Sequence, residues 1–254
     1  MAIKKAAASK PVVFLKNFII CLEYQFLQNK TRLREMKLDV SAMRYLGKDE
    51  YRVLTSVEMG MKNHELVPVE VITSIAKLRS GGAHKILSTL LRHKLIAHNN
   101  QQYDGYRLSY LGFDILALKT LLSRGVIASV GSQIGIGKES DIFEAQNAEG
   151  EDLVIKVHRL GRTSFRAVRR QRDYMKGKTK ASWLYMSRLA AIKEFAFMSA
   201  LHEHGFPTPV PFDQNRHIVA MSRVSGFPMA QIKTGQNMNT QKFVVLFSSN
   251  KSFL

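Results

Sequence analysis

A glycine-rich stretch near the middle of the chain limits the possible folds more than any other feature. Residues 135–143 read GIGKESDIF, in which Lys138 follows the second glycine and β-type residues end the stretch. Flexible backbone beside a fixed positive charge is typical of loops that bind phosphate. The residues around the stretch decide which kind of phosphate loop it is.

Spacing excludes two common kinds of glycine-rich loop. A Walker-type loop needs glycine five positions before its second glycine and Ser or Thr after its lysine, but this chain has Ser132 and Glu139 there. A dinucleotide-binding fingerprint needs a third glycine and a helix directly afterwards, whereas Ile142 and Phe143 favour a strand. The remaining kind is the kinase-type hairpin, which lies over the phosphates and is followed by a lysine on a strand.

A lysine of this kind follows in residues 152–160, DLVIKVHRL, where Lys156 has apolar neighbours. A lysine inside an apolar strand is costly to bury unless it is paired. Residues 182–205 form an amphipathic pattern that predicts a helix, with Glu194 among its apolar residues. We therefore predict an ion pair between Lys156 and Glu194, and the alternative is that Glu194 is a surface carboxylate beside Lys193.

The segment from residue 36 to about residue 124 is predicted to be mainly helical. Apolar residues at helical spacing predict helices over 49–65, 68–78 and 83–96, with Asp49 as an early cap of the first. Residues 95–110 predict two short strands around an Asn/Asp/Gly turn, and residues 111–125 predict a closing helix that ends at Gly125. Three helices followed by a two-stranded ribbon is the order of a winged-helix domain.

Basic residues are numerous, and the formal net charge is +18. Such an excess favours nucleic acid or another acidic surface as a partner. The third predicted helix, which would face the groove in a winged helix, carries the candidates Lys85, Arg92 and Lys94 beside two histidines. The alternative is an ordinary solvated helix face, and no Arg/Asn/Gln cluster at the helix start supports reading of bases.

A second basic run covers residues 159–182, and its candidate nucleic-acid contacts are Arg166, Arg169, Arg170 and Arg172. The alternative for this run is a solvated loop. Trp183, at its end, is left open between stacking on bases and packing in the protein. Residues 1–35 are expected to be unstructured or one amphipathic helix, since their apolar stretches are too short to span a membrane. The single cysteine, Cys21, excludes an internal disulfide and fits a reducing compartment.

Four segments together resemble a known family, and they read GIGKESDIF, IKVHRLGRTSFR, SWLYMSRLAAIKEFAFM and FPTPVPFDQNRHIVAM. They look like the RIO family of atypical serine/threonine protein kinases and ATPases, over about residues 36–229. The winged helix and the segment YRVLTSVEMGMKNHELVP point to the second subfamily. The resemblance implies an α+β protein, with an N-terminal winged helix before a kinase-like small lobe. It also implies ATP-dependent work in maturation of the small (40S) ribosomal subunit, contact with pre-40S particles and rRNA, and movement between cytoplasm and nucleus.

The resemblance also implies roles for individual residues. Lys156 would bind the α- and β-phosphates, and Glu194 would orient Lys156; these two are the candidate catalytic residues. Met221 would stand at the adenine pocket, and Ser222 and Val224 would offer backbone groups to adenine. Arg223 departs from the family pattern at that point. The phosphate loop would consist of Gly135, Gly137, Lys138, Glu139 and Ser140.

The sequence departs most from the family near its end. A kinase uses a catalytic aspartate and a metal-binding aspartate, but no Asp or Glu follows Asp213. We therefore expect a winged helix over 36–124, a small lobe over 125–232, an atypical tail over 233–254, no C-terminal lobe and no ligands for Mg²⁺. The expected function is ATP binding without turnover, and the alternative is a non-catalytic fragment that binds RNA or the pre-ribosome.

Overall fold

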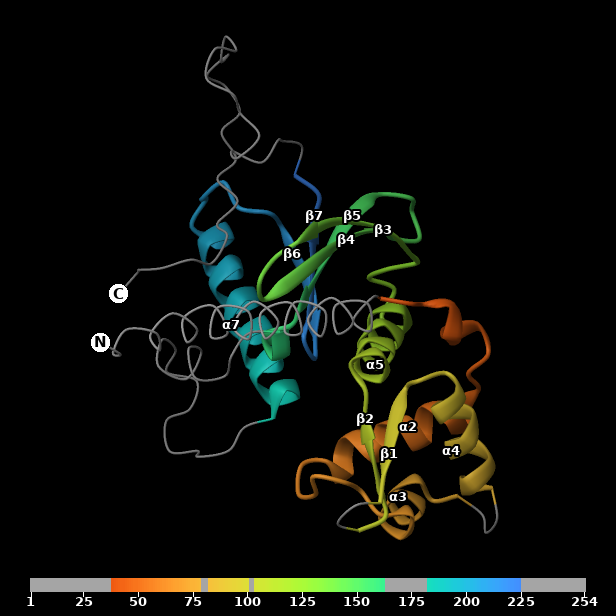
Figure 1. Cartoon of the computed structure of the whole chain (residues 1–254). Coiled ribbons are helices and arrows are strands. Elements are labelled where there is room, and N and C mark those ends of the chain that lie inside the picture. The colour runs from red at the N-terminus through yellow and green to blue at the C-terminus, as the bar shows by residue number, and fades with distance from the viewer. Residues whose placement is uncertain (1–37, 79–81, 101–102, 163–181, 225–254) are drawn as a thin grey trace, which may run out of the picture. The chain divides into compact units, whose positions relative to one another are not determined.

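The computed structural model describes residues 38–78, 82–100, 103–162 and 182–224 (Figure 1). The predicted extension over 1–35 and the tail over 233–254 lie outside the described residues. So do Arg166, Arg169, Arg170 and Arg172 of the second basic run. In the part of the chain that is described, no helix has the length and apolar character needed to cross a membrane.

The first half of the described chain is a winged helix. The two strands of its ribbon are antiparallel, with Ile96 opposite Leu108. The predicted order of three helices, a ribbon and a closing helix is confirmed, and Gly125 follows the last helix with a φ of +73°. The elements are the short 3-10 helix η1 (Ser41–Arg44), α2 (Lys48–Gly60), α3 (Val69–Ala76), α4 (Ala83–Arg92), β1 (Ile96–Asn99), β2 (Gly105–Leu108) and α5 (Tyr110–Ser123).

The prediction that Asp49 caps the first long helix is wrong. Helix α2 begins at Lys48, and Gly47 in extended conformation occupies the cap position. The Gly47 amide donates a hydrogen bond of 3.0 Å to the Glu50 carboxylate, which reaches back from the first turn. Glu50 therefore satisfies the free amide before the helix, and Asp49 pairs with Arg52 instead.

The second half contains a five-stranded antiparallel sheet in the order β3-β4-β5-β7-β6. One long helix, α7, packs on one face, where Ala191 and Met198 meet Val154, Val219 and Met221. A short 3-10 helix, η2 (Leu160–Arg162), follows β5. The elements are β3 (Ser129–Ile136), β4 (Ser140–Gln146), β5 (Asp152–His158), α7 (Trp183–Glu203), β6 (Pro211–Asn215) and β7 (Ile218–Ser222).

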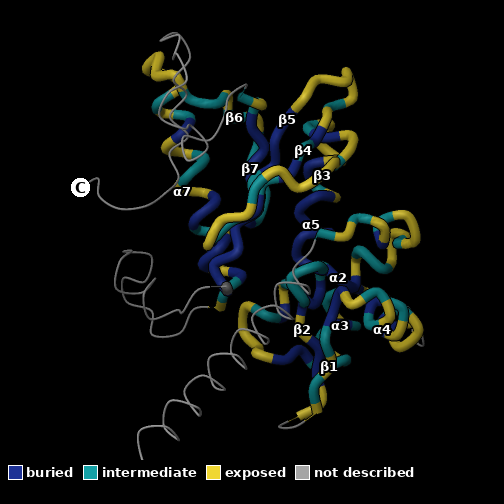
Figure 2. The backbone as a smooth tube through the Cα atoms, turned by 45° about the horizontal axis from the view of Figure 1, so that its top comes forward, coloured by how far each residue is buried: buried dark blue, intermediate teal, exposed yellow. Residues whose placement is uncertain are grey.

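Helix α5 is shared by the two halves. Its residues 112–118 are all buried, which Figure 2 shows as a largely dark blue segment. Phe113, Ile115 and Leu116 belong to the winged-helix core, while other positions of α5 contact β6 and β7. A helix that is buried on every side lies between two packed layers. Helix α5 is thus the structural link between the winged helix and the sheet.

Candidate nucleotide site

The predicted phosphate loop forms the tight turn between β3 and β4. Gly135 lies near the end of β3, opposite Ile142, and Ser140 begins β4. The Gly137 amide donates a hydrogen bond of 2.7 Å to the Ser140 carbonyl and so closes the turn. A Cβ atom on Gly137 would lie 3.0 Å from that carbonyl oxygen, which explains a glycine at this position. Lys138 and Glu139 complete the turn.

The predicted ion pair is present beneath this sheet. Lys156 on β5 places its Nζ 2.5 Å from Glu194 Oε1 on α7. The second carboxylate oxygen, Oε2, lies 3.0 Å from Nε2 of His158. Sequence reasoning missed His158, although residues two apart on a strand face the same side, so its position after Lys156 was the available signal. Glu194 therefore holds two side chains of β5 in place.

The surroundings of Glu194 keep its carboxyl group ionised. Burial alone would raise the pKa of Glu194, but the close contact with His158 and the charge of Lys156 outweigh it and lower the pKa to about 2. Only 12% of the Lys156 side chain is exposed. An ammonium group carries three N–H donors, so pairing with Glu194 leaves Lys156 able to meet a further anion. This arrangement suits a phosphate group.

The other end of the site is β7. Met221 is buried opposite Val154 on β5, and its contact with adenine stays a prediction. The Ser222 amide donates a hydrogen bond of 2.9 Å to the Val210 carbonyl, and the Ser222 hydroxyl accepts a hydrogen bond from the Val210 amide. Because its amide is already used, Ser222 can offer adenine only its carbonyl. Val224 is the last described residue of the chain, and its contact with adenine stays a prediction.

Arg223, where the sequence departs from the family pattern, is directed toward the sheet. Its guanidinium lies 3.3 Å from Glu144 on β4 and 3.3 Å from Asp152 on β5. These pairs are about half exposed, so their contribution to stability is small. They nevertheless hold the Arg223 side chain against the two strands.

A second group of charges lies in the interior on the side of α5. Arg159, directly after β5, donates two hydrogen bonds of 2.6 and 2.7 Å to the Asp114 carboxylate on α5. Asp114 also lies 2.7 Å from His217 Nε2, and Asp141 lies 3.5 Å from Arg159 Nε. All four side chains are at most 1% exposed. We call these residues the Arg159 cluster.

The charges in the Arg159 cluster are fixed at neutral pH. Burial raises the pKa of Asp114, but the charge of Arg159 and the hydrogen bond to His217 outweigh it and lower the pKa. Burial lowers the pKa of His217 to about 4, despite the nearby Asp114. Asp114 is therefore ionised and His217 neutral at pH 7. No hydrophobic period marks these residues, and sequence reasoning missed all of them.

The described residues offer no magnesium site built from three side chains. Among the described residues, no three His, Cys, Asp or Glu side chains gather in a way that could hold a metal ion. Beyond Asp213 the sequence has no carboxylate, which is the ligand that Mg²⁺ prefers.

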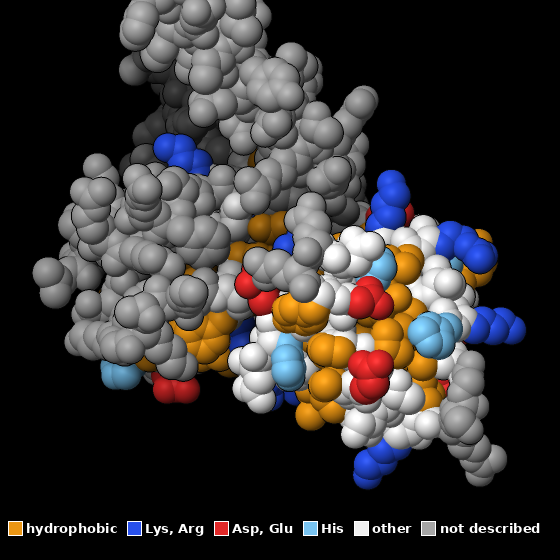
Figure 3. Space-filling model, turned by 60° about the horizontal axis from the view of Figure 1, so that its bottom comes forward, with side chains coloured by type: hydrophobic (Ala, Val, Ile, Leu, Met, Phe, Trp, Pro, Cys, Tyr) orange, Lys and Arg blue, Asp and Glu red, His pale blue; other side chains and the backbone are white. Residues whose placement is uncertain are grey.

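The candidate nucleic-acid residues of the winged helix are exposed. Lys85 and Arg92 lie on α4, and Lys94 follows it with a φ of +57°. Figure 3 looks toward this end of the molecule, where basic side chains stand apart, separated by apolar, acidic and histidine side chains. Trp183 stacks on Tyr110 with ring centroids 3.6 Å apart, so its role is packing.

Two protein families match the chain. The family described as "Rio2, N-terminal" matches residues 43–124, and the family described as "RIO domain" matches residues 141–250. The second match reaches residue 250 and so includes most of the segment 233–254, in which the sequence analysis expected no resemblance to the family. The first match ends at residue 124, one residue after the end of α5 at Ser123.

Relatives are similar over three quarters of the chain. Serine/threonine-protein kinase rio2 of Dictyostelium discoideum is 58% identical over 78% of this chain and 38% of that protein. RIO-type serine/threonine-protein kinase Rio2 of Methanocaldococcus jannaschii is 32% identical over 74% of this chain and 68% of that protein. The crystal structure of the Rio2 kinase-ADP/Mg²⁺-phosphoaspartate complex from Chaetomium thermophilum matches with a TM-score of 0.68 and 53% identity, over 78% of this chain and 59% of that one. This chain thus spans well under two thirds of the Dictyostelium and Chaetomium proteins.

Proposed function

Since this chain belongs to the Rio2 subfamily of the RIO family of serine/threonine kinases, we propose that it binds ATP between the β3–β4 turn, Lys156 and the end of β7. The observation that carries the proposal is the Lys156–Glu194 pair, 2.5 Å apart, on the face of the sheet that α7 covers. An ammonium held there by a carboxylate of low pKa is suited to the α- and β-phosphates. The ADP complex of the Chaetomium Rio2 kinase supports this choice of ligand.

Each part of the site has a distinct task in this proposal. The turn of Gly137, Lys138 and Glu139 offers backbone N–H groups and a positive charge to the phosphates. Glu194 keeps Lys156 charged and fixes its direction, and His158 holds Glu194 in turn. Met221 closes the back of the adenine pocket, and the backbone beyond it offers hydrogen bonds to the base.

The sequence of this chain shows no identifiable groups that could catalyse phosphate transfer. Transfer in kinases depends on a catalytic aspartate and on metal ions that neutralise developing charge, and no Asp or Glu follows Asp213. Losing groups of this kind costs about 100- to 1,000-fold each in rate. We therefore propose that the 254-residue chain binds ATP without turning it over, while kinase or ATPase activity is a property of whole Rio2 proteins.

The biological role that we propose is maturation of the small (40S) ribosomal subunit. The chain would contact the pre-40S particle and its rRNA, and it would act in the cytoplasm and enter the nucleus. The net charge of +18 and the exposed Lys85, Arg92 and Lys94 support an RNA-rich partner. A second candidate function, RNA binding without any use of ATP, rests on the same residues.

The test of ATP binding is calorimetry on the full chain. We expect saturable binding of ATP that is lost in Lys156→Ala, while Lys193→Ala, which removes a neighbour of Glu194 on α7, leaves it unchanged. Phosphate release followed in parallel should stay at the background rate. Absence of ATP binding by the unaltered chain would reject the proposal, and release that depends on Lys156 would reject the lack of turnover.

The RNA role is tested by salt dependence. Binding of a ribosomal RNA fragment should weaken steeply as salt rises, and neutralising Lys85, Arg92 and Lys94 together should reduce the slope by about two to three units of log affinity per log salt. Three exposed lysines or arginines in the sheet half serve as the matched control. An unchanged slope would show that α4 makes no phosphate contacts.

A further inference from the structure

The Arg159 cluster has no task in the proposed site, although it lies directly beside the phosphate loop. Four ionisable side chains, from α5, from β4, from the β6–β7 turn and from the residue after β5, are buried together. Burying charges costs several kcal/mol per ion unless excellent geometry compensates, and apolar residues would often serve stability as well. The cluster therefore calls for an explanation other than stability alone.

The cluster holds the end of β5 firmly against α5. The Asp114 carboxylate receives both terminal nitrogens of Arg159, a bidentate geometry that fixes direction as well as distance. Two residues further on, a Cβ atom on Gly161 would lie 1.8 Å from the Tyr110 hydroxyl oxygen on α5. The segment 159–161 is thus pressed against α5 along its length.

Arg159 also contacts the phosphate loop. The Arg159 amide donates a hydrogen bond of 2.5 Å to the carbonyl of Glu139, the last residue of the turn. The Arg159 side chain lies 3.5 Å from Asp141, which is on β4 directly after the turn and is fully buried. Arg159 therefore contacts residues on both sides of Ser140, through its backbone on one side and its guanidinium on the other.

We propose that Arg159 is a positioning residue through which helix α5 of the winged helix sets the position of the phosphate loop, residues 137–140. The loop is short and begins with a glycine, so its own sequence does not restrict it to one conformation. The buried bidentate pair of Arg159 and Asp114 has one geometry and therefore fixes the position of Arg159. The Arg159 amide, which donates to the Glu139 carbonyl, in turn fixes the position of that carbonyl. The winged helix thereby becomes a part of the phosphate-binding apparatus, a conclusion whose ligand rests on the proposed function.

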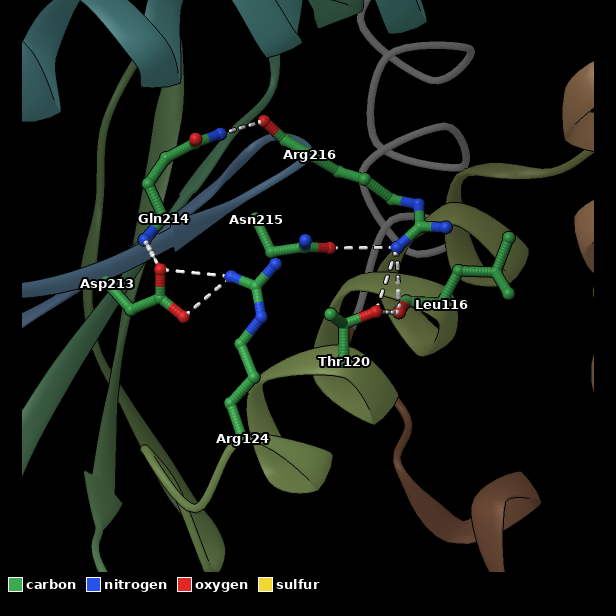
Figure 4. A network of polar contacts seen from close by, with 7 residues as sticks. All are labelled: Leu116, Thr120, Arg124, Asp213, Gln214, Asn215 and Arg216. Carbon is green, nitrogen blue, oxygen red and sulfur yellow. Dashed lines mark hydrogen bonds and ion pairs between the residues drawn. The ribbon is translucent and has the colours of Figure 1, made fainter.

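A second set of contacts joins α5 to the sheet without reaching the loop, and it supplies the control. Arg124 at the end of α5 bonds Asp213 on β6 at 2.8 and 3.1 Å (Figure 4). Arg216, in the β6–β7 turn, donates to the Leu116 carbonyl and the Thr120 hydroxyl of α5, and pairs with Glu58 on α2. Removing the Arg124 contact loosens the attachment of α5 but leaves the connection to Glu139 intact.

The test compares ligands with and without phosphate. In Asp114→Asn, Arg159 loses its bidentate partner, and we expect ATP and ADP to bind about tenfold more weakly or worse, with adenosine affinity unchanged. In Arg124→Ala, all three affinities should stay unchanged. Equal losses for ATP and adenosine would indicate general disruption and overturn the proposal, as would an unchanged ATP affinity.

Two further measurements keep the test decisive. If Asp114→Asn fails to fold, the charge-free combination Asp114→Asn, Arg159→Met and Asp141→Asn removes the buried charges, and the same selective loss is expected in it. Hydrogen exchange needs no ligand: the amides of Gly137 and Arg159 should exchange about tenfold faster in the folded variant than in the unaltered chain, and not in Arg124→Ala. Unchanged exchange would overturn the proposal even if ATP does not bind, whereas failure of the unaltered chain to bind ATP, with faster exchange in the variant, would reject only the proposed function.

Discussion

The winged-helix core and the Arg159 cluster are equally buried, but the first consists of apolar side chains and the second of ionisable ones. In the first, Leu54, Val57, Ile72 and Leu90 are fully shielded from solvent. In the second, Asp114 and Arg159 are at most 1% exposed, and they meet two further ionisable side chains. Apolar burial has no preferred direction, whereas a bidentate ion pair in the interior tolerates only one arrangement. Helix α5 contributes to both regions, so one helix is held by two different kinds of force.

The two regions should therefore respond differently to substitution. An apolar core accepts residues of similar volume at small cost, because neighbours can repack. A buried charge cannot adapt, since the loss of one partner leaves the other unpaired in a medium of low dielectric constant. A phosphate loop requires contacts in fixed positions, which the Arg159 cluster supplies. Its scaffold can tolerate substitutions of similar volume, as the winged-helix core does. The predictions below test this difference in order of expected effect.

The largest effect is expected for Arg159→Met. This change leaves Asp114 and Asp141 buried without their cation, and we expect the free energy of unfolding to fall by about 3–5 kcal/mol. Urea unfolding followed by circular dichroism measures it. The charge-free combination of Arg159→Met with Asp114→Asn and Asp141→Asn should recover a large part of the loss. A fall below 1 kcal/mol would mean that the cluster differs little from the apolar core.

A smaller effect is expected in the core itself. Leu90 on α4 is fully buried, and Leu90→Ala removes its apolar contacts and leaves a cavity. We expect a loss of about 2–4 kcal/mol in the free energy of unfolding. Leu90→Met, which nearly conserves volume, should lose less than about 1.5 kcal/mol in the same urea experiment. Similar losses for the two changes would contradict the assumed tolerance of this region.

A still smaller effect is expected for the pair of Lys156 and Glu194. The folded-state pKa of Glu194 is about 2, below the ordinary value of 4.5, so its stabilisation is complete above about pH 5 and is lost as the pH falls toward 2. The loss should reach about 2–3 kcal/mol. Unfolding free energies at several pH values, measured for the unaltered chain and for Glu194→Gln, isolate this part because Asp114 titrates in both. A parallel pH dependence in the two proteins would show that Glu194 has an ordinary pKa.

The sequence predicts the winged helix well because its stability comes from periodic apolar residues. Positions such as Val53, Leu54 and Val57 repeat at helical spacing, and the structure buries them. The Lys156–Glu194 pair was also predictable, because a charge in an apolar strand needs a partner and the following helix offers one carboxylate among apolar residues. Asp49 failed as a cap because α2 begins one residue earlier, at Lys48, which places Asp49 inside the first turn.

The Arg159 cluster could not be predicted in this way. Asp114 and Arg159 are 45 positions apart, and His217 is 103 positions from Asp114. Asp114 does stand among the apolar residues Phe113 and Ile115, but no spacing or neighbour in the sequence indicates partners so far away along the chain. The resemblance to a family likewise placed Arg159 in a basic run with solvent or RNA as its expected environment. The three-dimensional structure shows that Arg159 itself is buried.

The smallest effect is expected where charge and exposure combine. Arg124 and Asp213 form an ion pair 2.8 Å long between α5 and β6, and about half of the Arg124 side chain is exposed. Water and salt screen such a pair, so Arg124→Ala should lower the free energy of unfolding by no more than about 1 kcal/mol, and less at high salt. Urea unfolding at low and high salt checks both statements. The same two layers of the protein are joined by Arg159, so the two arginines differ mainly in burial. A loss for Arg124→Ala as large as that for Arg159→Met would show that joining α5 to the sheet, rather than burial of the charge, determines the cost.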